Sequence, residues 1–115
     1  MSDERWIAVY YHNRRRQEVV LEEIQSFGLR NYAKILGTVE LICEYGLQVR
    51  GHLTKHIEGK LWEIRVDKYR VLYCAITNKR LVMLKAFVKK TDKTPAREIK
   101  TAWNRLQDYL EQSEE

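Results

Sequence analysis

The sequence predicts an α+β fold in which a small, mostly antiparallel sheet packs against helices. Three strand-like runs follow one another within residues 61–90, separated only by the short connections 67–68 and 78–80. In residues 29–45 and 95–110, apolar residues instead recur at three- and four-residue steps, as on one face of a helix. The expected order of elements is β-α-α-β-β-β-α.

The first half of the chain contributes one strand and two helices to this prediction. Trp6–Tyr11 is an apolar run of strand-forming residues. Asn13 is placed to cap a first helix, which ends at Gly28. The second helix follows over residues 29–45, and residues 47–59 are expected to form a polar connector.

The second half holds the three strands and the last helix. The strands are expected over residues 61–66, 69–76 and 81–90. Alternation in the first of them separates two faces, with Trp62, Ile64 and Val66 on one and Leu61, Glu63 and Arg65 on the other. Thr94 is a good N-cap for the last helix, and Pro95 suits its first position because its missing N–H is not needed there.

Length and composition suit one globular domain, which we expect to span residues 1–115. No apolar run approaches the roughly 18 residues of a membrane span. The first residues lack a signal-peptide pattern, so a cytoplasmic location is expected. Cys43 and Cys74 lie far apart in apolar segments, which predicts buried free thiols in a reducing compartment.

Positive charge is concentrated in the strands and their flanks. The chain has a net charge of +5, and residues 52–100 hold thirteen Lys or Arg against five Asp or Glu. Residues 1–51 are neutral by the same count. A cationic sheet suits a polyanion, for which RNA is the leading candidate, and a merely solubilising surface is the alternative.

Arg65 and Arg70 are the leading candidates for catalysis. If residues 67–68 form a tight turn, the two guanidinium groups lie near the same end of paired strands. Guanidinium forks bind phosphate oxygens in pairs and stay charged at any relevant pH. They are therefore suited to stabilising the pentacoordinate phosphate of RNA cleavage. The alternative role is structural, namely an ion pair between one of them and Glu63.

Lysines near the strands are expected to add phosphate contacts. Lys89 and Lys90 end the last strand and face opposite ways, so at most one of them points into a groove. Lys85 stands among apolar neighbours, which we interpret as an exposed or groove position. Lys89 is assigned to catalysis, and the expected RNA-binding residues are Lys55, Lys60, Lys85, Lys90 and Tyr69.

No motif identifies the group that transfers the proton. The candidates are Tyr69, Tyr73, His56 and Lys89, and the two tyrosines could also stack on bases. His52 and His56 are four residues apart, but no third ligand stands nearby, so neither a metal nor a cofactor is expected. The run Arg14–Arg16 is expected to open the first helix and to contact RNA, an acidic partner or only solvent.

Four motifs in order carry a resemblance to a known family. They are Glu-x-Arg at 63–65, Tyr-Arg at 69–70, Phe-x-Lys-Lys-Thr at 87–91, and the Thr-Pro helix start at 94–95. Over about residues 53–110 the chain resembles the HigB-like, phage-derived branch of the RelE/ParE toxin superfamily. Lys85 departs from the family pattern, and the first fifty residues are similar in layout only.

The resemblance implies a RelE-like fold and the toxin half of a type II toxin–antitoxin pair. RelE-side members cleave mRNA, usually on the ribosome and without a metal, by activating the ribose 2′-hydroxyl against its own phosphate. By position, Arg65 and Arg70 match the arginines of the family, and Lys89 and Lys90 match its strand-end lysines. A cognate antitoxin that covers or distorts the basic site is also implied.

Two other functions stay open at this point. ParE-side members share the fold but block DNA gyrase without cutting RNA, so a non-enzymatic gyrase inhibitor is one alternative. The other is an inactive domain that binds nucleic acid or the antitoxin. Our expectation is a ribosome-dependent mRNA endoribonuclease that arrests translation.

Overall fold

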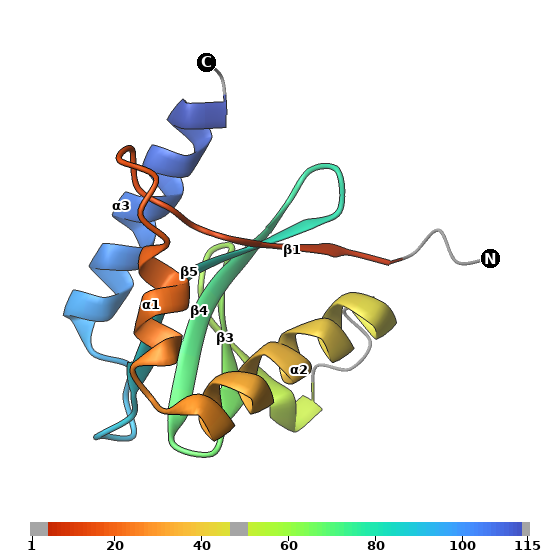
Figure 1. The fold of residues 1–115 in the computed structure, drawn as a ribbon, viewed down its shortest axis with the longest axis vertical. Helices are drawn as coiled ribbons and strands as arrows, with labels where there is room; N and C mark the ends of the chain where they lie inside the picture. The colour runs from red at the N-terminus through yellow and green to blue at the C-terminus, as the bar shows by residue number, and fades with distance from the viewer. Residues whose placement is uncertain (1–4, 47–50, 114–115) are drawn as a thin grey trace.

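The computed structural model describes residues 5–46 and 51–113 and confirms the predicted α+β class. Its elements follow in the order shown in Figure 1. They are β1 (Ile7–Tyr10), α1 (Val19–Gln25), α2 (Leu29–Tyr45), the short 3-10 helix η2 (Gly51–Leu53), β2 (Thr54–Glu58), β3 (Leu61–Val66), β4 (Tyr69–Ile76), β5 (Arg80–Val88) and α3 (Ala96–Ser113).

The five strands form one sheet in the order β1-β5-β4-β3-β2. Strands β2 to β5 pair as consecutive antiparallel hairpins, whereas β1 pairs in parallel with β5. The amide N–H of Ile7 donates to the carbonyl oxygen of Lys79 at 2.8 Å, which fixes the start of that parallel pair. The sheet is therefore mostly antiparallel, as the sequence predicts.

Helices cover both faces of the sheet. The α2 face carries Tyr69, whose ring stacks on Phe27 with centroids 4.5 Å apart. The α3 face carries Glu63, which accepts a hydrogen bond from Thr94 just before α3. α1 lies beside α3 (Figure 1), where Glu23 and Arg105 form an ion pair of 2.9 Å.

The core lies between these layers and includes residues from every strand except β1 and β2. Its largest fully buried side chains include Tyr73, Ile35, Ile42, Leu72 and Met83. Cys43 and Cys74 are buried free thiols, as predicted. None of the helices in the described residues combines enough length and hydrophobicity to cross a membrane.

Most element boundaries agree with the sequence prediction. Strands β3 and β4 and helix α2 have the predicted limits, and Arg65 and Arg70 face each other across the tight turn at 67–68. The last strand ends at Val88 rather than at Lys90. Helix α3 begins at Ala96, one residue later than predicted.

The predicted connector at 47–59 is corrected by the structure. Residues 47–50 lie outside the described residues, but Thr54–Glu58 form β2 at the edge of the sheet. The sequence gives little sign of this strand because Ile57 is its one large apolar residue. A polar edge strand of this kind resists pairing with other chains.

The prediction that Arg14–Arg16 open the first helix is wrong. Asn13 caps a turn instead, because its Oδ1 accepts from the amide N–H groups of Arg15 and Gln17, each at 2.9 Å. Helix α1 then begins only at Val19, and no side chain caps it. Arg14 pairs with Asp108 of α3 at 2.8 Å, so it ties the loop to that helix.

Candidate functional site

A pocket lies at the end of the sheet where the β3–β4 turn meets the loop between β5 and α3. In Figure 1 this turn and this loop lie at the same end of the molecule. The amide N–H of Lys89 donates to the carbonyl oxygen of Lys68 at 2.6 Å and holds the loop against the turn. The pocket is lined by Lys55, Glu63, Arg65, Arg70, Phe87, Lys89, Thr91, Asp92, Lys93, Thr94 and Pro95.

The floor of the pocket is a buried ion pair. The side chains of Glu63 and Arg70 are only 6% and 7% exposed, and the Arg70 Nε lies 3.7 Å from the Glu63 Oε2. Arg70 Nη1 also donates to the carbonyl oxygens of Asp67 and Tyr69, at 2.9 and 2.8 Å. The floor therefore holds the β3–β4 turn in one conformation.

Burial and the neighbouring charges have opposing effects on the pKa of Arg70. Burial lowers the pKa of Arg70 most, Glu63 raises it, and the nearby Arg65 lowers it. An arginine nevertheless remains protonated in proteins.

The second oxygen of Glu63 accepts from the Thr94 hydroxyl at 3.0 Å, so the same carboxylate also anchors the start of α3.

The rim of the pocket is cationic. Arg65 is exposed, and in the part of the chain that the structure describes it has no ion-pair partner. Lys55 stands opposite Glu63 in the β2–β3 register and is also exposed. Lys89 Nζ lies 3.9 Å from Asp92, and Lys93 completes the rim. Five cations and two carboxylates line the pocket, so its field attracts anions.

The structure brings four of the sequence-predicted site residues together, namely Lys55, Arg65, Arg70 and Lys89. Lys90, the neighbour of Lys89, does not line this pocket, as the alternation of side chains predicts. Lys60 lies in the β2–β3 turn and lines a different groove, between the end of β4 and α3.

Tyr69 and Lys85 occupy positions that differ from the predicted ones. Tyr69 is 8% exposed and packs on the α2 face, where Asn31 donates to its hydroxyl at 3.1 Å. Its ring is therefore not available to stack on a base. Lys85 is partly buried and pairs with Glu23 at 3.2 Å and Glu98 at 3.8 Å. It joins α1, β5 and α3 rather than lining the pocket, because the two carboxylates hold it there.

Two of the other proton-transfer candidates also lie away from the pocket. His56 and Tyr73 flank Trp62 in the sheet register, so they share its face, opposite to that of Glu63. His56 Nε2 is 2.8 Å from the carbonyl oxygen of Gly59, a contact that stabilises the β2–β3 turn. Of the four candidates, only Lys89 lines the pocket.

The loop at 91–95 contributes to the pocket, although the sequence did not predict this. Thr91, Asp92 and Lys93 line the pocket because the chain turns back over the sheet between β5 and α3. The signal for this was the polar run after Lys90, which leads directly into the Thr-Pro helix start. In residues 5–46 and 51–113 no group of three or more His, Cys, Asp or Glu side chains is placed to hold a metal ion.

Comparison with known proteins identifies one family. A family model described as "Phage derived protein Gp49-like (DUF891)" matches residues 22–107, about three quarters of the chain. The match includes every residue that lines the pocket. A search of curated proteins found no match.

Proposed function

The chain belongs to the family of phage-derived Gp49-like proteins, and from this premise we propose that it is the toxin of a type II toxin–antitoxin system. The proposed toxin domain spans residues 1–115 and has the HigB-type activity of the RelE side, which is metal-independent cleavage of mRNA on the ribosome. The observation that carries the proposal is the cationic pocket, whose rim is formed by Lys55, Arg65, Lys89 and Lys93.

The proposed reaction is an internal transfer of a phosphoryl group. The ribose 2′-oxygen attacks the adjacent phosphorus and loses its proton to a base. The bond from phosphorus to the 5′-oxygen breaks, and that oxygen gains a proton. The products are a 2′,3′-cyclic phosphate and a 5′-hydroxyl end. Negative charge builds up on the phosphate oxygens on the way, which fixed cations stabilise.

Arg65 and Lys89 are the residues proposed to contact the reacting phosphate. Arg65 is exposed at the pocket, and its planar guanidinium can bind two phosphate oxygens at once. Lys89, the first residue after β5, supplies a point charge. Its ammonium is suited to protonating the leaving 5′-oxygen, because it is a donor with a mobile proton.

Arg70 is proposed to act through the residues around it rather than through direct contact. Its side chain is buried, forms an ion pair with Glu63 and donates hydrogen bonds to two backbone carbonyls. In that position it holds the Glu63 carboxylate and the β3–β4 turn in place, so that Arg65 projects over the pocket. A loosely held arginine would lose much of its effect, since catalysis depends on preorganised charges.

Asp92 is proposed as the group that accepts the 2′-hydroxyl proton. Two carboxylates line the pocket, and Glu63 is already bonded to Thr94 and paired with Arg70. Asp92 is fully exposed and lies 3.9 Å from the Lys89 Nζ, so it is open to a substrate. Asp92 and Lys89 would then form the base and acid pair of the reaction.

Induction in a bacterial host tests the proposal. Wild type and Arg65→Ala are induced side by side, and the 5′ ends of all mRNAs are mapped after growth stops. We expect new 5′ ends within translated regions for the wild type and none for Arg65→Ala. Arrest without new ends would favour a gyrase-type toxin, and no arrest would favour an inactive binding domain. Either result would overturn the proposal.

A further inference from the structure

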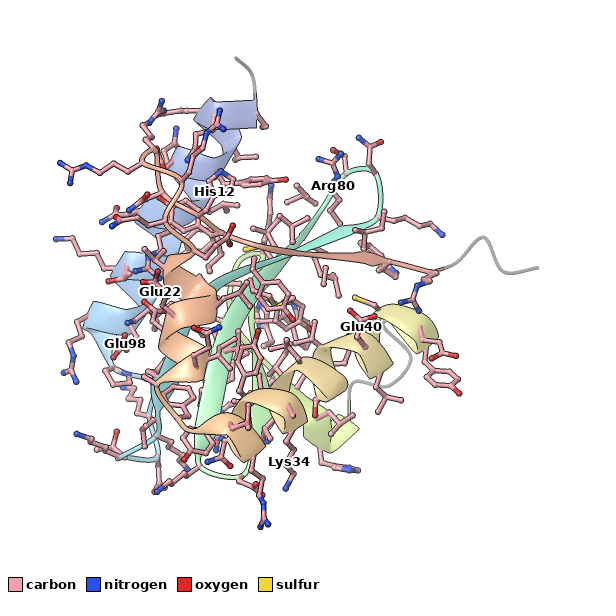
Figure 2. All side chains as sticks on the ribbon, viewed as in Figure 1. His12, Glu22, Lys34, Glu40, Arg80 and Glu98 are labelled. Atoms are coloured by element: carbon pink, nitrogen blue, oxygen red, sulfur yellow. The ribbon has the colours of Figure 1, made fainter. Side chains whose placement is uncertain are left out.

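A second groove lies at the opposite end of the sheet from the cationic pocket. It runs between the end of β4 with the β4–β5 turn and the last two turns of α3. Figure 2 shows Arg80 at this end of the molecule, well separated from Glu98 in the first turn of α3. The side chains that shape it are Ala75, Ile76, Leu106, Tyr109, Leu110, Lys60 and Arg80.

The floor of this groove is apolar. Leu106 is buried against the sheet, but Ala75, Ile76, Tyr109 and Leu110 are each only partly covered. The last part of the apolar stripe of α3 is thus only partly covered by the sheet. A groove that combines apolar side chains with a polar rim suits a partner that also presents both kinds of group. RNA would make little use of these apolar side chains, because its charged phosphate backbone mainly contacts cations.

The rim of the groove is cationic. Lys60 stands on one side and Arg80 on the other, and both are exposed. The Arg80 Nη1 donates to the Tyr109 hydroxyl at 3.4 Å, which holds the guanidinium over the groove. No carboxylate belongs to the described lining, so the cations face the opening without a neutralising partner among those residues. A complementary partner therefore carries carboxylates beside its apolar side chains.

We infer that this groove binds an acidic, amphipathic helical segment of the antitoxin. The inference rests on the proposed function, because it assigns the binding surface of the partner that this function requires. Residues 106–113 span about 10 Å at about 1.5 Å per residue, which is enough for about two turns of a partner helix. Its apolar side chains lie on the floor and its carboxylates pair with Lys60 and Arg80, as in other helix-in-groove complexes.

The position of the groove has a consequence for neutralisation. Its lining shares no residue with the cationic pocket. A segment bound there anchors the antitoxin without touching Arg65, and a different part of the antitoxin must act on the pocket. Changes in the groove should consequently weaken the complex without altering any residue that lines the cationic pocket.

Titration calorimetry tests the inference with the full-length cognate antitoxin. The toxin carries Arg65→Ala, which permits its expression. In that background Lys60→Glu with Arg80→Glu is expected to raise the Kd at least about 100-fold, because like charges then face each other. The control pair, Arg30→Glu with Lys100→Glu, makes the same change in charge at exposed positions outside both pockets and should change the Kd less than about 3-fold.

Two results would overturn the inference. One is an unchanged Kd for the groove variant, and the other is an equal loss in the control, which would indicate a general effect of charge. Circular dichroism and the Tm establish that each variant is folded, and the milder pair Lys60→Gln with Arg80→Gln should give an intermediate Kd. Failure of the proposed function gives a different result, because the wild type would then neither arrest growth nor cut mRNA.

Discussion

Arg65 and Arg70 stand directly opposite each other on β3 and β4, yet only Arg65 faces solvent. Like charges in such a cross-strand pair are normally destabilising. Here Glu63, two residues before Arg65, pairs with Arg70 beneath the surface and offsets the repulsion. The two arginines therefore have different roles, with Arg65 open to a substrate and Arg70 fixed in the floor.

The buried pair in the floor should be sensitive to the loss of one partner. Replacing Glu63 with Ala is expected to lower the free energy of unfolding by about 3–5 kcal/mol, because the Arg70 charge would stay buried without its partner. Replacing Thr94 with Val removes a single hydrogen bond to Glu63 and should cost only about 1 kcal/mol. Urea unfolding followed by circular dichroism measures both changes.

A double variant provides the control for this prediction. Glu63→Leu combined with Arg70→Met removes both charges and keeps the side-chain volume similar. It should recover most of the stability that Glu63→Ala loses, since no unpaired charge remains. A double variant as unstable as Glu63→Ala would show that the ion pair is not the source of the effect.

Lys55 and Lys85 should respond differently to replacement by Met. Lys55→Met removes an exposed cation of the pocket, so it should weaken RNA binding and reduce the slope of log K against log salt by about 1. Lys85→Met should leave RNA binding unchanged and lower stability, because Glu23 and Glu98 lose a partly buried partner. RNA titrations at several salt concentrations, with unfolding curves for both proteins, measure these effects. Equal losses of RNA binding in the two variants would contradict this account of the site.

The two thiols should be protected from alkylation in the folded protein. Burial raises the pKa of both Cys43 and Cys74 to about 11 from the ordinary value of 9.0. Because the thiolate is the reacting form, iodoacetamide at pH 8 should modify the native protein at least about 100-fold more slowly than the urea-unfolded chain. Mass spectrometry over time gives both rates, and similar rates would contradict the burial of these thiols.

The same shifts predict a loss of stability at high pH. A thiol whose pKa is raised by folding contributes its full stabilisation below the unfolded pKa. As the pH rises from about 9 towards 11, the unfolded chain ionises first and the stabilisation is lost. Unfolding curves from pH 8 to 11 should show this decline, and a variant with Cys43→Ala and Cys74→Ala should show less of it.

Local sequence signals were sufficient for β3, β4 and α2. The signal for each of these elements lies within its own residues. These signals are the alternation around Trp62, the two-residue link at 67–68 and the helical spacing of 29–45. The pairing of Arg65 with Arg70 could also be predicted locally, because a tight turn at 67–68 fixes the register between β3 and β4. Strand β2 has no such signal, since an edge strand exposed to water needs few apolar residues.

The roles of Lys85 and Tyr69 depend on residues far away in the sequence. Lys85 pairs with Glu23, which is 62 positions earlier, and no local pattern indicates that contact. The sequence does not determine which face of the sheet Tyr69 occupies, because this depends on which helix covers that face. The loop at 91–95 joins the pocket for a similar reason, because only the packing of α3 determines where that loop turns back.

Cleavage of mRNA on programmed ribosomes by the purified protein tests the central claim most directly. The rate of a single turnover is measured for the wild type and for Arg65→Ala, and the new ends are analysed chemically. We expect the wild type to produce 2′,3′-cyclic phosphate and 5′-hydroxyl ends, and Arg65→Ala, with an unchanged Tm, to be at least about 100-fold slower. Equal rates for the two proteins, or no cleavage by the wild type, would contradict the account.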